Sequence, residues 1–413
     1  MIRLLLSNLL YMYLLQIIRL LFPLVLIPVL TRVLSPESFG IYIYTISCAM
    51  WLSIIVDYGF NISATRKLSA LTDKSEMKNI VARTQSAKIL LGAFSIIFLV
   101  IGYFFLKSFA AKPIWLLLSW ALGVMLGLTP VYYFQAINDL KFPSVVEVSS
   151  GILLLVTVLT FVKSDAEFTL LACLMFFSRV IAWKIIERRV LTQLQLKYRE
   201  ILNFSMVKST LKEGWDIFLL QGAVSFYTSF NVVLVGFLCG PVAVGGYAAA
   251  ERIIRTGLTF IAQASAVLFP KVVALRVQDR AALQKLRKIS LVGFGCIGLL
   301  GMFSAWAASS LIMSLLFSNK FPEARHIFNV MALVFPAIAI GNVLSFQYLM
   351  AENKEKILNG VIVVAAMVSL AIGYPVVSYF GAVGMAYLWI SVEWCILIAL
   401  ISIVSSKSYK NLS

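Results

Sequence analysis

The sequence predicts an all-α polytopic membrane protein with 12 transmembrane helices, six in each half of the chain. Of its 413 residues, 61% are hydrophobic and only 13% are charged, whereas a soluble domain carries about 25% charged residues. The charges divide the chain into apolar runs of roughly 20 residues, the length with which an α-helix crosses a bilayer. These two observations exclude a soluble enzyme, a secreted disulfide scaffold, a coiled coil and a disordered chain.

The apolar runs place the spans in two groups. They lie near 9–30, 40–62, 86–106, 114–136, 145–162 and 167–187, then near 215–238, 245–268, 289–314, 327–350, 357–379 and 382–404. The first run is too long for a cleavable signal sequence and contains Pro23 and Pro28. We therefore expect an N-terminal six-helix bundle over 1–190, a basic cytoplasmic linker over 191–214 and a C-terminal six-helix bundle over 215–413.

The distribution of basic residues predicts the orientation. An even number of spans puts both termini on one side, and 25 of the 35 Lys and Arg residues flank the spans on that side. Six lie on the opposite side and four lie inside spans. Because cytoplasmic loops are enriched in Lys and Arg, both termini are expected in the cytoplasm. Most of the net charge of +17 is thus explained by topology, and no nucleic-acid partner is implied, although basic loops could contact lipid headgroups.

No metal, cofactor or catalytic residue is predicted. The five cysteines are scattered singly, His326 is the only histidine, and no phosphate-binding G-x-x-x-x-G-K-[ST] motif occurs. Gly293-Phe-Gly-Cys-Ile-Gly298 matches a dinucleotide-binding pattern but lies inside a span, so close helix packing is expected there. The same packing is expected from the spacings Gly123/Gly127 and Gly236/Gly240.

Ionisable residues inside the spans are the candidate functional residues, because each costs about 2.5–3.5 kcal/mol at the bilayer centre. In the first span, Gln16 and Arg19 share a mostly polar helical face with Asn8 and Pro23. This stripe fits a face that lines a cavity and could bind substrate. The alternative is that Arg19 forms an interhelical salt bridge with a carboxylate such as Glu393.

Three more charged residues lie near the start of the eighth span. Glu251 and Arg255 are four residues apart and could pair on one helical face, which would leave Arg252 for an incoming anion. Structural pairing and substrate binding are equally compatible with this pattern. A buried carboxylate, Glu251 or Glu393, could also carry proton or sodium antiport.

The buried charges favour an anionic substrate. The spans contain two more arginines than glutamates: Arg19, Arg179, Arg252 and Arg255 against Glu251 and Glu393. The planar guanidinium of arginine can donate two hydrogen bonds to phosphate oxygens.

Other polar or aromatic positions have simpler explanations. Arg179 could snorkel to the cytoplasmic surface. Solvated helix ends are expected for Asp57, Glu147 and Asp216, and bilayer anchoring, rather than a sugar path, for Tyr132, Tyr133 and Phe134.

Several segments resemble the Wzx-type O-antigen flippases, in the polysaccharide-transporter branch of the multidrug/oligosaccharidyl-lipid/polysaccharide exporter superfamily. They are Pro23-Leu-Val-Leu-Ile-Pro28, Leu30-Thr-Arg-Val-Leu-Ser-Pro-Glu-Ser-Phe-Gly40, Asp57-Tyr-Gly-Phe-Asn-Ile-Ser-Ala-Thr-Arg66, Tyr247-Ala-Ala-Ala-Glu-Arg-Ile253 and Gly381-Ala-Val-Gly-Met-Ala386. In the fourth span the chain departs from the family's Pro-x-Trp-x-Phe-Gln-Gly-x-Glu pattern, with Tyr132, Ala136 and Asn138 in place of Trp, Gly and Glu. No role of that glutamate is therefore expected here.

The resemblance implies a substrate and a mechanism. The substrate is an undecaprenyl-pyrophosphate-linked oligosaccharide, moved across a bacterial inner membrane by two six-helix bundles in a V-shaped arrangement that alternate their access. Membrane lipid and other O-antigen assembly proteins are the implied partners. The alternatives are a multidrug or organic-cation exporter, an O-antigen polymerase, a lipid II flippase and a structural scaffold. A drug exporter is expected to have an acidic cavity, a polymerase to have large periplasmic loops, and a lipid II flippase to have two further spans, and the sequence indicates none of these. A scaffold leaves the buried arginines unexplained.

Overall fold

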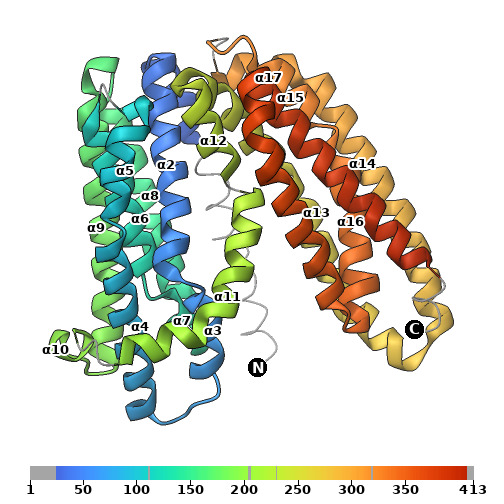
Figure 1. Ribbon diagram of the computed structural model, residues 1–413, viewed down its shortest axis with the longest axis horizontal. Coiled ribbons are helices and arrows are strands. Elements are labelled where there is room, and N and C mark those ends of the chain that lie inside the picture. The colour runs from blue at the N-terminus through green and yellow to red at the C-terminus, as the bar shows by residue number, and fades with distance from the viewer. Residues whose placement is uncertain (1–24, 110–111, 203–205, 229, 318–319, 407–413) are drawn as a thin grey trace. The chain divides into compact units, whose positions relative to one another are not determined.

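The computed structural model describes residues 25–109, 112–202, 206–228, 230–317 and 320–406, and these residues contain helices and connecting turns but no β-strand (Figure 1). The chain divides into two compact units, unit 1 (Met1–Ser225) and unit 2 (Phe226–Ser413). Within the described ranges, nine helical segments are long and apolar enough to cross a membrane. The chain is therefore an all-helical, multi-pass membrane protein.

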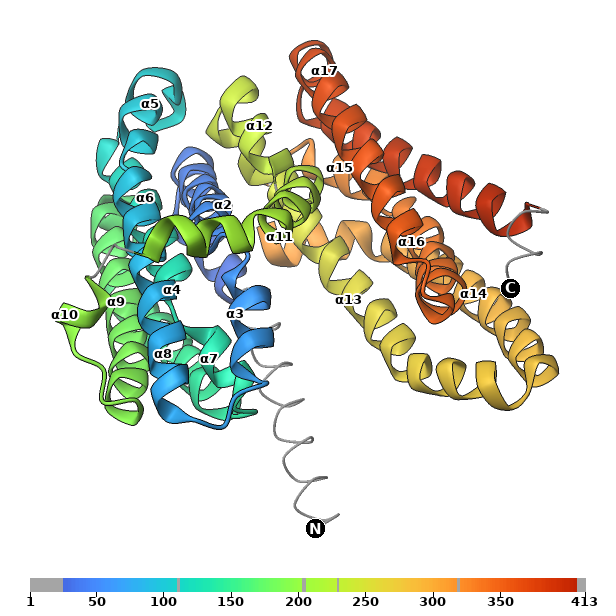
Figure 2. The same cartoon turned by 60° about the horizontal axis from the view of Figure 1, so that its bottom comes forward.

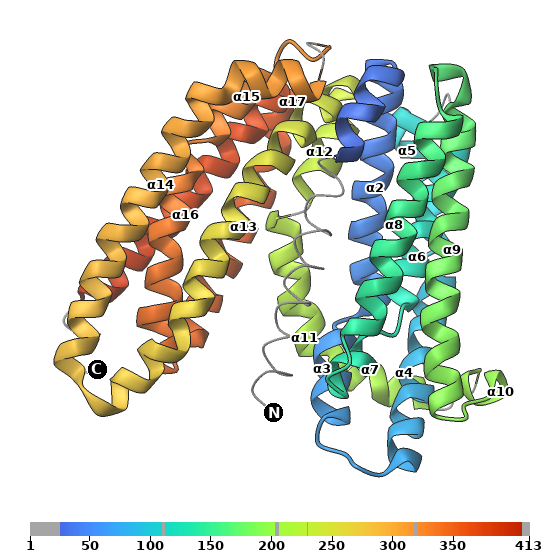
Figure 3. The ribbon, with the colours of Figure 1, turned by 180° about the vertical axis from the view of Figure 1, so that it is seen from behind.

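Unit 1 begins, in its described part, with a helix over 25–33. Its further α-helices are α2 (Pro36–Asp57), α3 (Phe60–Leu68), α4 (Lys74–Phe94), α5 (Ile97–Phe105), α6 (Pro113–Leu128), α7 (Val131–Ala136), α8 (Lys141–Phe161), α9 (Phe168–Gln193), α10 (Tyr198–Ile201) and α11 (Val207–Thr228). Short 3₁₀ turns η1 (Lys107–Phe109) and η2 (Asp165–Glu167) lie between them. Helices α2, α6, α8 and α9 run side by side, as two opposite views show (Figures 1 and 3).

Unit 2 contains fewer and longer helices. They are α12 (Phe230–Cys239), α13 (Pro241–Gln278), α14 (Arg280–Phe317), α15 (Ala324–Met331), α16 (Val334–Val343), the π-helix η4 (Leu344–Leu349), the 3₁₀ turn η5 (Met350–Glu352) and α17 (Glu355–Ser405). At about 1.5 Å per residue, the 38 residues of α13 and of α14 each extend well beyond a hydrocarbon core of about 30 Å. These helices therefore exceed the predicted spans because they continue outside the membrane.

The predicted spans correspond closely to these helices. Eight spans each fall on one of the nine segments, and the last two share α17. That helix is in fact two limbs, because Gly381 has non-helical backbone angles (φ 62°, ψ −150°) where the spans are expected to divide (Figure 2). The span near 215–238 falls on α11 and α12, and most of the span near 9–30 lies outside the described residues.

Helix α2 ends earlier than its predicted span because of two left-handed residues. Tyr58 (φ 52°) and Gly59 (φ 75°) follow Asp57 and turn the chain into α3. Gly59 also lies against α11, where an added Cβ would come within 2.7 Å of the Ile217 Cγ2 atom. Both the positive φ and this contact favour glycine at the position.

The predicted close packing is confirmed at the first glycine pair. A Cβ at Gly123 would lie 2.8 Å from the Ala49 carbonyl oxygen, and one at Gly127 would lie 2.5 Å from the Val56 Cβ. The two glycines therefore let α6 approach the backbone of α2. The packing is also confirmed at Gly298, which lies against α16. A Cβ at Gly240, in contrast, would meet no described atom within 4 Å, and this residue instead forms a turn with φ 83°.

The end of the predicted basic linker is a docked helix. Within residues 206–219, Glu213 pairs with Lys67 and lies 3.8 Å from Arg83. The ring of Phe218 stacks on that of Tyr58 with 4.4 Å between the centroids. These contacts attach the first half of α11 to α3, α4 and the end of α2.

Candidate functional site

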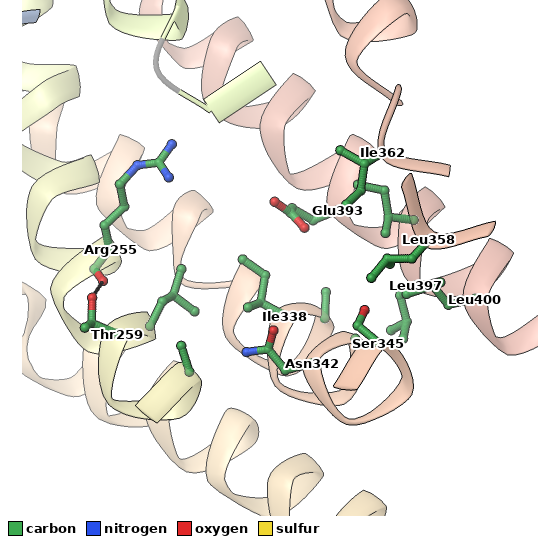
Figure 4. Close-up of a pocket in the computed structure, with 15 residues that line it drawn as sticks. Arg255, Thr259, Ile338, Asn342, Ser345, Leu358, Ile362, Glu393, Leu397 and Leu400 are labelled. Carbon is green, nitrogen blue, oxygen red and sulfur yellow. Dashed lines mark hydrogen bonds between the residues drawn. The ribbon is translucent and has the colours of Figure 1, made fainter. Parts of the chain in front are cut away.

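A pocket of about 470 Å³ lies inside unit 2, between α13, α16, η4 and both limbs of α17 (Figure 4). Its polar wall contains Arg255, Thr259, Asn342, Ser345 and Glu393. Most of its other lining residues are aliphatic, and they include side chains from the start and the end of α17. The pocket thus combines a small charged region with hydrocarbon walls.

Arg255 projects into this pocket from α13. Its Nε and one terminal nitrogen donate to the same oxygen of Glu251, at 2.9 and 2.7 Å, which confirms the predicted i,i+4 pair. The Glu251 side chain is only 8% exposed, whereas that of Arg255 is 35% exposed. The carboxylate is therefore buried behind the arginine, and the guanidinium is the group presented to a ligand.

Trp389 connects Arg255 to the second charged residue of the pocket. The Arg255 guanidinium carbon lies 4.8 Å from the centroid of the Trp389 ring, in the range of a cation–π contact. On the other side, the indole N–H of Trp389 donates to a Glu393 oxygen at 3.2 Å. Trp389 and Glu393 are one helical turn apart, so they share a face of α17. Sequence reasoning does not single out Trp389, because an isolated tryptophan carries no signal.

Two other predicted site residues that the structure describes, Arg252 and Arg179, do not line this pocket. Arg252 is on the same helix as Arg255 but is exposed and absent from the pocket walls. Arg179 lies in unit 1, where it donates to Glu147 and to the Thr129 hydroxyl oxygen, both at 2.7 Å. Snorkelling is therefore the wrong explanation for Arg179, and Glu147 is not simply a solvated helix end. Gln16 and Arg19 lie outside the described residues.

Unit 1 contains a buried ion pair that the sequence does not predict. The ammonium group of Lys88 is fully buried and lies 2.7 Å from an Asp57 oxygen. It also donates to the Gly127 carbonyl oxygen at 2.9 Å and lies 4.9 Å from the centroid of the Tyr132 ring. In the sequence, Lys88 follows Lys78 and Arg83 closely, which suggests a basic cytoplasmic flank. The expectation of a solvated helix end is wrong for Asp57.

This pair helps to stabilise the broken end of α6. Thr129 is extended (ψ 121°) because Pro130 follows it, so the last carbonyls of α6 lose helical partners. Lys88 donates to the Gly127 carbonyl and Gln85 to the Leu128 carbonyl at 3.3 Å. A cation near the C-terminus of a helix is also favoured by the helix dipole.

The structure changes two expectations about this region and about charge. Tyr132, Tyr133 and Phe134 are buried in unit 1, so bilayer anchoring is wrong for them.

The predicted charge balance of the spans, an excess of two positive charges, leaves out three residues. They are Lys88, Asp57 and Glu147, which belong to buried or partly buried ion pairs. Counting them reduces the excess from two positive charges to one, so Arg255, which lines the pocket, is the main support for an anionic substrate.

The helices and the pocket define a multi-pass helical membrane protein in which a charged pocket lies inside a helical unit. The chain belongs to the polysaccharide biosynthesis protein family, whose model matches residues 5–275. It is 27% identical over 389 residues to a Shigella dysenteriae protein named "Putative O-antigen transporter", covering 92% of this chain and 94% of that protein. A protein of the same name from Escherichia coli (strain K12) is 23% identical over 391 residues, covering 94% and 93%.

Solved transporter structures share the fold. A multidrug resistance MATE family transporter of the MOP superfamily, in an inward-facing conformation, matches with a TM-score of 0.72, 14% identity and coverage of 95% of this chain and 96% of that chain. The lipid II flippase MurJ, in an inward closed conformation, matches with a TM-score of 0.71, 14% identity and coverage of 98% and 89%. The predicted family resemblance is confirmed, and the chain is a transporter rather than an enzyme.

Proposed function

We propose that this protein is a flippase for undecaprenyl-pyrophosphate-linked O-antigen repeat units. It moves them from the cytoplasmic to the periplasmic leaflet of a bacterial inner membrane. The names of the two relatives support the O-antigen substrate, and the fold shared with the lipid II flippase MurJ supports a lipid-linked one. In this proposal, 12 spans form two six-helix bundles with both termini in the cytoplasm, and the bundles alternate their access.

The observation that carries the proposal is Arg255, a cation in the wall of a pocket that is lined mainly by aliphatic side chains. A cationic head against hydrocarbon walls suits an amphiphile with an anionic headgroup. Arg255 would donate to a pyrophosphate oxygen, and charge-assisted hydrogen bonds contribute about 1.5–3 kcal/mol each. Asn342, Ser345 and Thr259 provide uncharged polar groups in the lining of the same pocket. Glu393 and Glu251 are the carboxylates available for ion coupling.

A second candidate function is supported by a different observation. Glu393 lines the pocket together with Arg255, and Glu251 is paired with Arg255 behind the wall; carboxylates beside a pocket suit an organic cation. A multidrug or organic-cation exporter is therefore the alternative function. The two substrates differ in charge, so genetic assays can separate them.

Neutralising the Arg255–Glu251 pair is expected to reduce flipping. The double variant Glu251→Gln/Arg255→Gln removes the cation without leaving an unpaired buried carboxylate. In a strain that lacks its own O-antigen flippase but keeps the matching synthesis genes, we expect surface lipopolysaccharide at least about tenfold below that of wild type, because losing one charge-assisted hydrogen bond exceeds about 1.4 kcal/mol. The measurement is the lipopolysaccharide gel ladder, normalised to membrane levels by blotting.

Two further arms make this experiment decisive. Lys285→Gln removes an exposed cation of unit 2 away from the pocket and should keep the wild-type ladder, whereas Arg252→Gln tests the exposed neighbour on α13. A full ladder from the double variant would remove Arg255 from the mechanism. No ladder from wild type, together with increased resistance to cationic drugs, would favour the exporter.

A further inference from the structure

We infer that Trp389 makes the anion site at Arg255 and the carboxylate Glu393 interdependent, an inference that rests on the proposed function of this pocket. The indole contacts both charged side chains, one with its ring face and the other with its N–H group. Trp389 is itself only 2% exposed. It therefore acts as a positioning residue behind the pocket wall rather than as a ligand contact.

Each part of the indole has a separate task. The ring face lies against the Arg255 guanidinium with 4.8 Å to the centroid, which limits the directions in which the guanidinium can point. The ring N–H donates to Glu393 at 3.2 Å and holds that carboxylate at the pocket wall. Phenylalanine would keep the first contact and lose the second, and leucine would lose both.

The consequence is an electrostatic coupling across the pocket. A carboxylate in the wall of the same pocket opposes an anion bound at Arg255, because charges interact more strongly where water is partly excluded than they do in bulk water. Loss of the N–H bond removes one of the contacts that hold the Glu393 carboxylate in place, so its effect on the anion decreases. Trp389 thus determines how strongly the negative charge of Glu393 weakens anion binding at Arg255.

The test is a double-mutant cycle on the full chain in lipid nanodiscs, with radiolabelled farnesyl pyrophosphate as the probe. We expect Glu393→Gln to tighten binding about tenfold in the wild-type background, because it removes a negative charge from the pocket. In the Trp389→Phe background, the same change should alter the Kd less than about threefold. Trp389→Leu should also weaken binding itself, because the cation–π contact is lost.

Trp394→Phe is the matched control. It lies on the same helix, and its indole N–H also makes one hydrogen bond, to the Leu333 carbonyl oxygen at 3.2 Å. In that background, Glu393→Gln should keep its full tenfold effect, which a general disturbance of α17 would not allow. An unchanged effect of Glu393→Gln in Trp389→Phe, or no effect of Glu393→Gln in wild type, would overturn the coupling.

The same cycle separates this inference from the proposed function. If Glu251→Gln/Arg255→Gln binds farnesyl pyrophosphate as tightly as wild type does, the anion site itself is wrong. If binding depends on Arg255 while Trp389→Phe keeps the full effect of Glu393→Gln, only the role of Trp389 fails. A loss of coupling in Trp389→Phe together with dependence on Arg255 supports both.

Discussion

Lys88→Met is expected to be the most destabilising substitution in unit 1. It leaves Asp57 in a buried position without its cation, and breaking a buried ion pair in this way costs about 3–5 kcal/mol. Asp57 is 9% exposed, and its Oδ1 atom is 2.7 Å from the ammonium group. We expect a large drop in membrane level and in the thermal unfolding midpoint of the purified protein, measured side by side with wild type.

The double variant Lys88→Met/Asp57→Asn should recover most of this loss. It removes both charges together, so the remaining cost is mainly the lost hydrogen bond to the Gly127 carbonyl, about 1 kcal/mol. Lys67→Met is the matched control, because Lys67 pairs with Glu213 at a partly exposed site where ion pairs contribute about 0–1 kcal/mol. If the double variant is as unstable as Lys88→Met, then removing the charge pair together does not restore the fold and the assignment of the cost to Asp57 is wrong.

Gly127→Ala is expected to have the second largest effect on stability. The new methyl group would come within 2.5 Å of the Val56 Cβ and 3.1 Å of the Ser53 carbonyl oxygen. The clash is with the Val56 Cβ, which is fixed to the backbone of α2, so α6 must move away, and such overpacking costs about 1–3 kcal/mol. The movement would also stretch the bond from Lys88 to the Gly127 carbonyl. The measurement is the thermal unfolding midpoint of the purified protein in detergent, which should be lower than that of wild type.

Gly360→Ala is the control for this substitution. Gly360 is also inside a helix, but no described atom lies within 4 Å of a Cβ at that position. Alanine favours a helix over glycine by about 0.8–1.0 kcal/mol, so this variant should be as stable as wild type or slightly more stable. Adding Val56→Gly to Gly127→Ala removes the clashing side chain and should recover part of the midpoint. Equal midpoints for Gly127→Ala and Gly360→Ala would show that α2 and α6 do not need this close contact.

Much of the candidate site can be found from the sequence because it depends on local spacing. Glu251 and Arg255 are four residues apart, and that spacing places them on one face of any helix. Glu393 stands out because a carboxylate is rare inside an apolar run. The place of Trp389 cannot be found in the same way, since it follows from how α17 packs against α13.

The sequence by itself determined the membrane class, the positions of most spans and the family. These properties follow from the length and apolarity of runs and from short motifs, all of which are local. The tertiary structure alone decided which charges on different helices meet, as Lys88 with Asp57 and Arg179 with Glu147 show. Such pairs join residues about 30 positions apart on different helices, and their contact depends on how those helices pack rather than on sequence spacing.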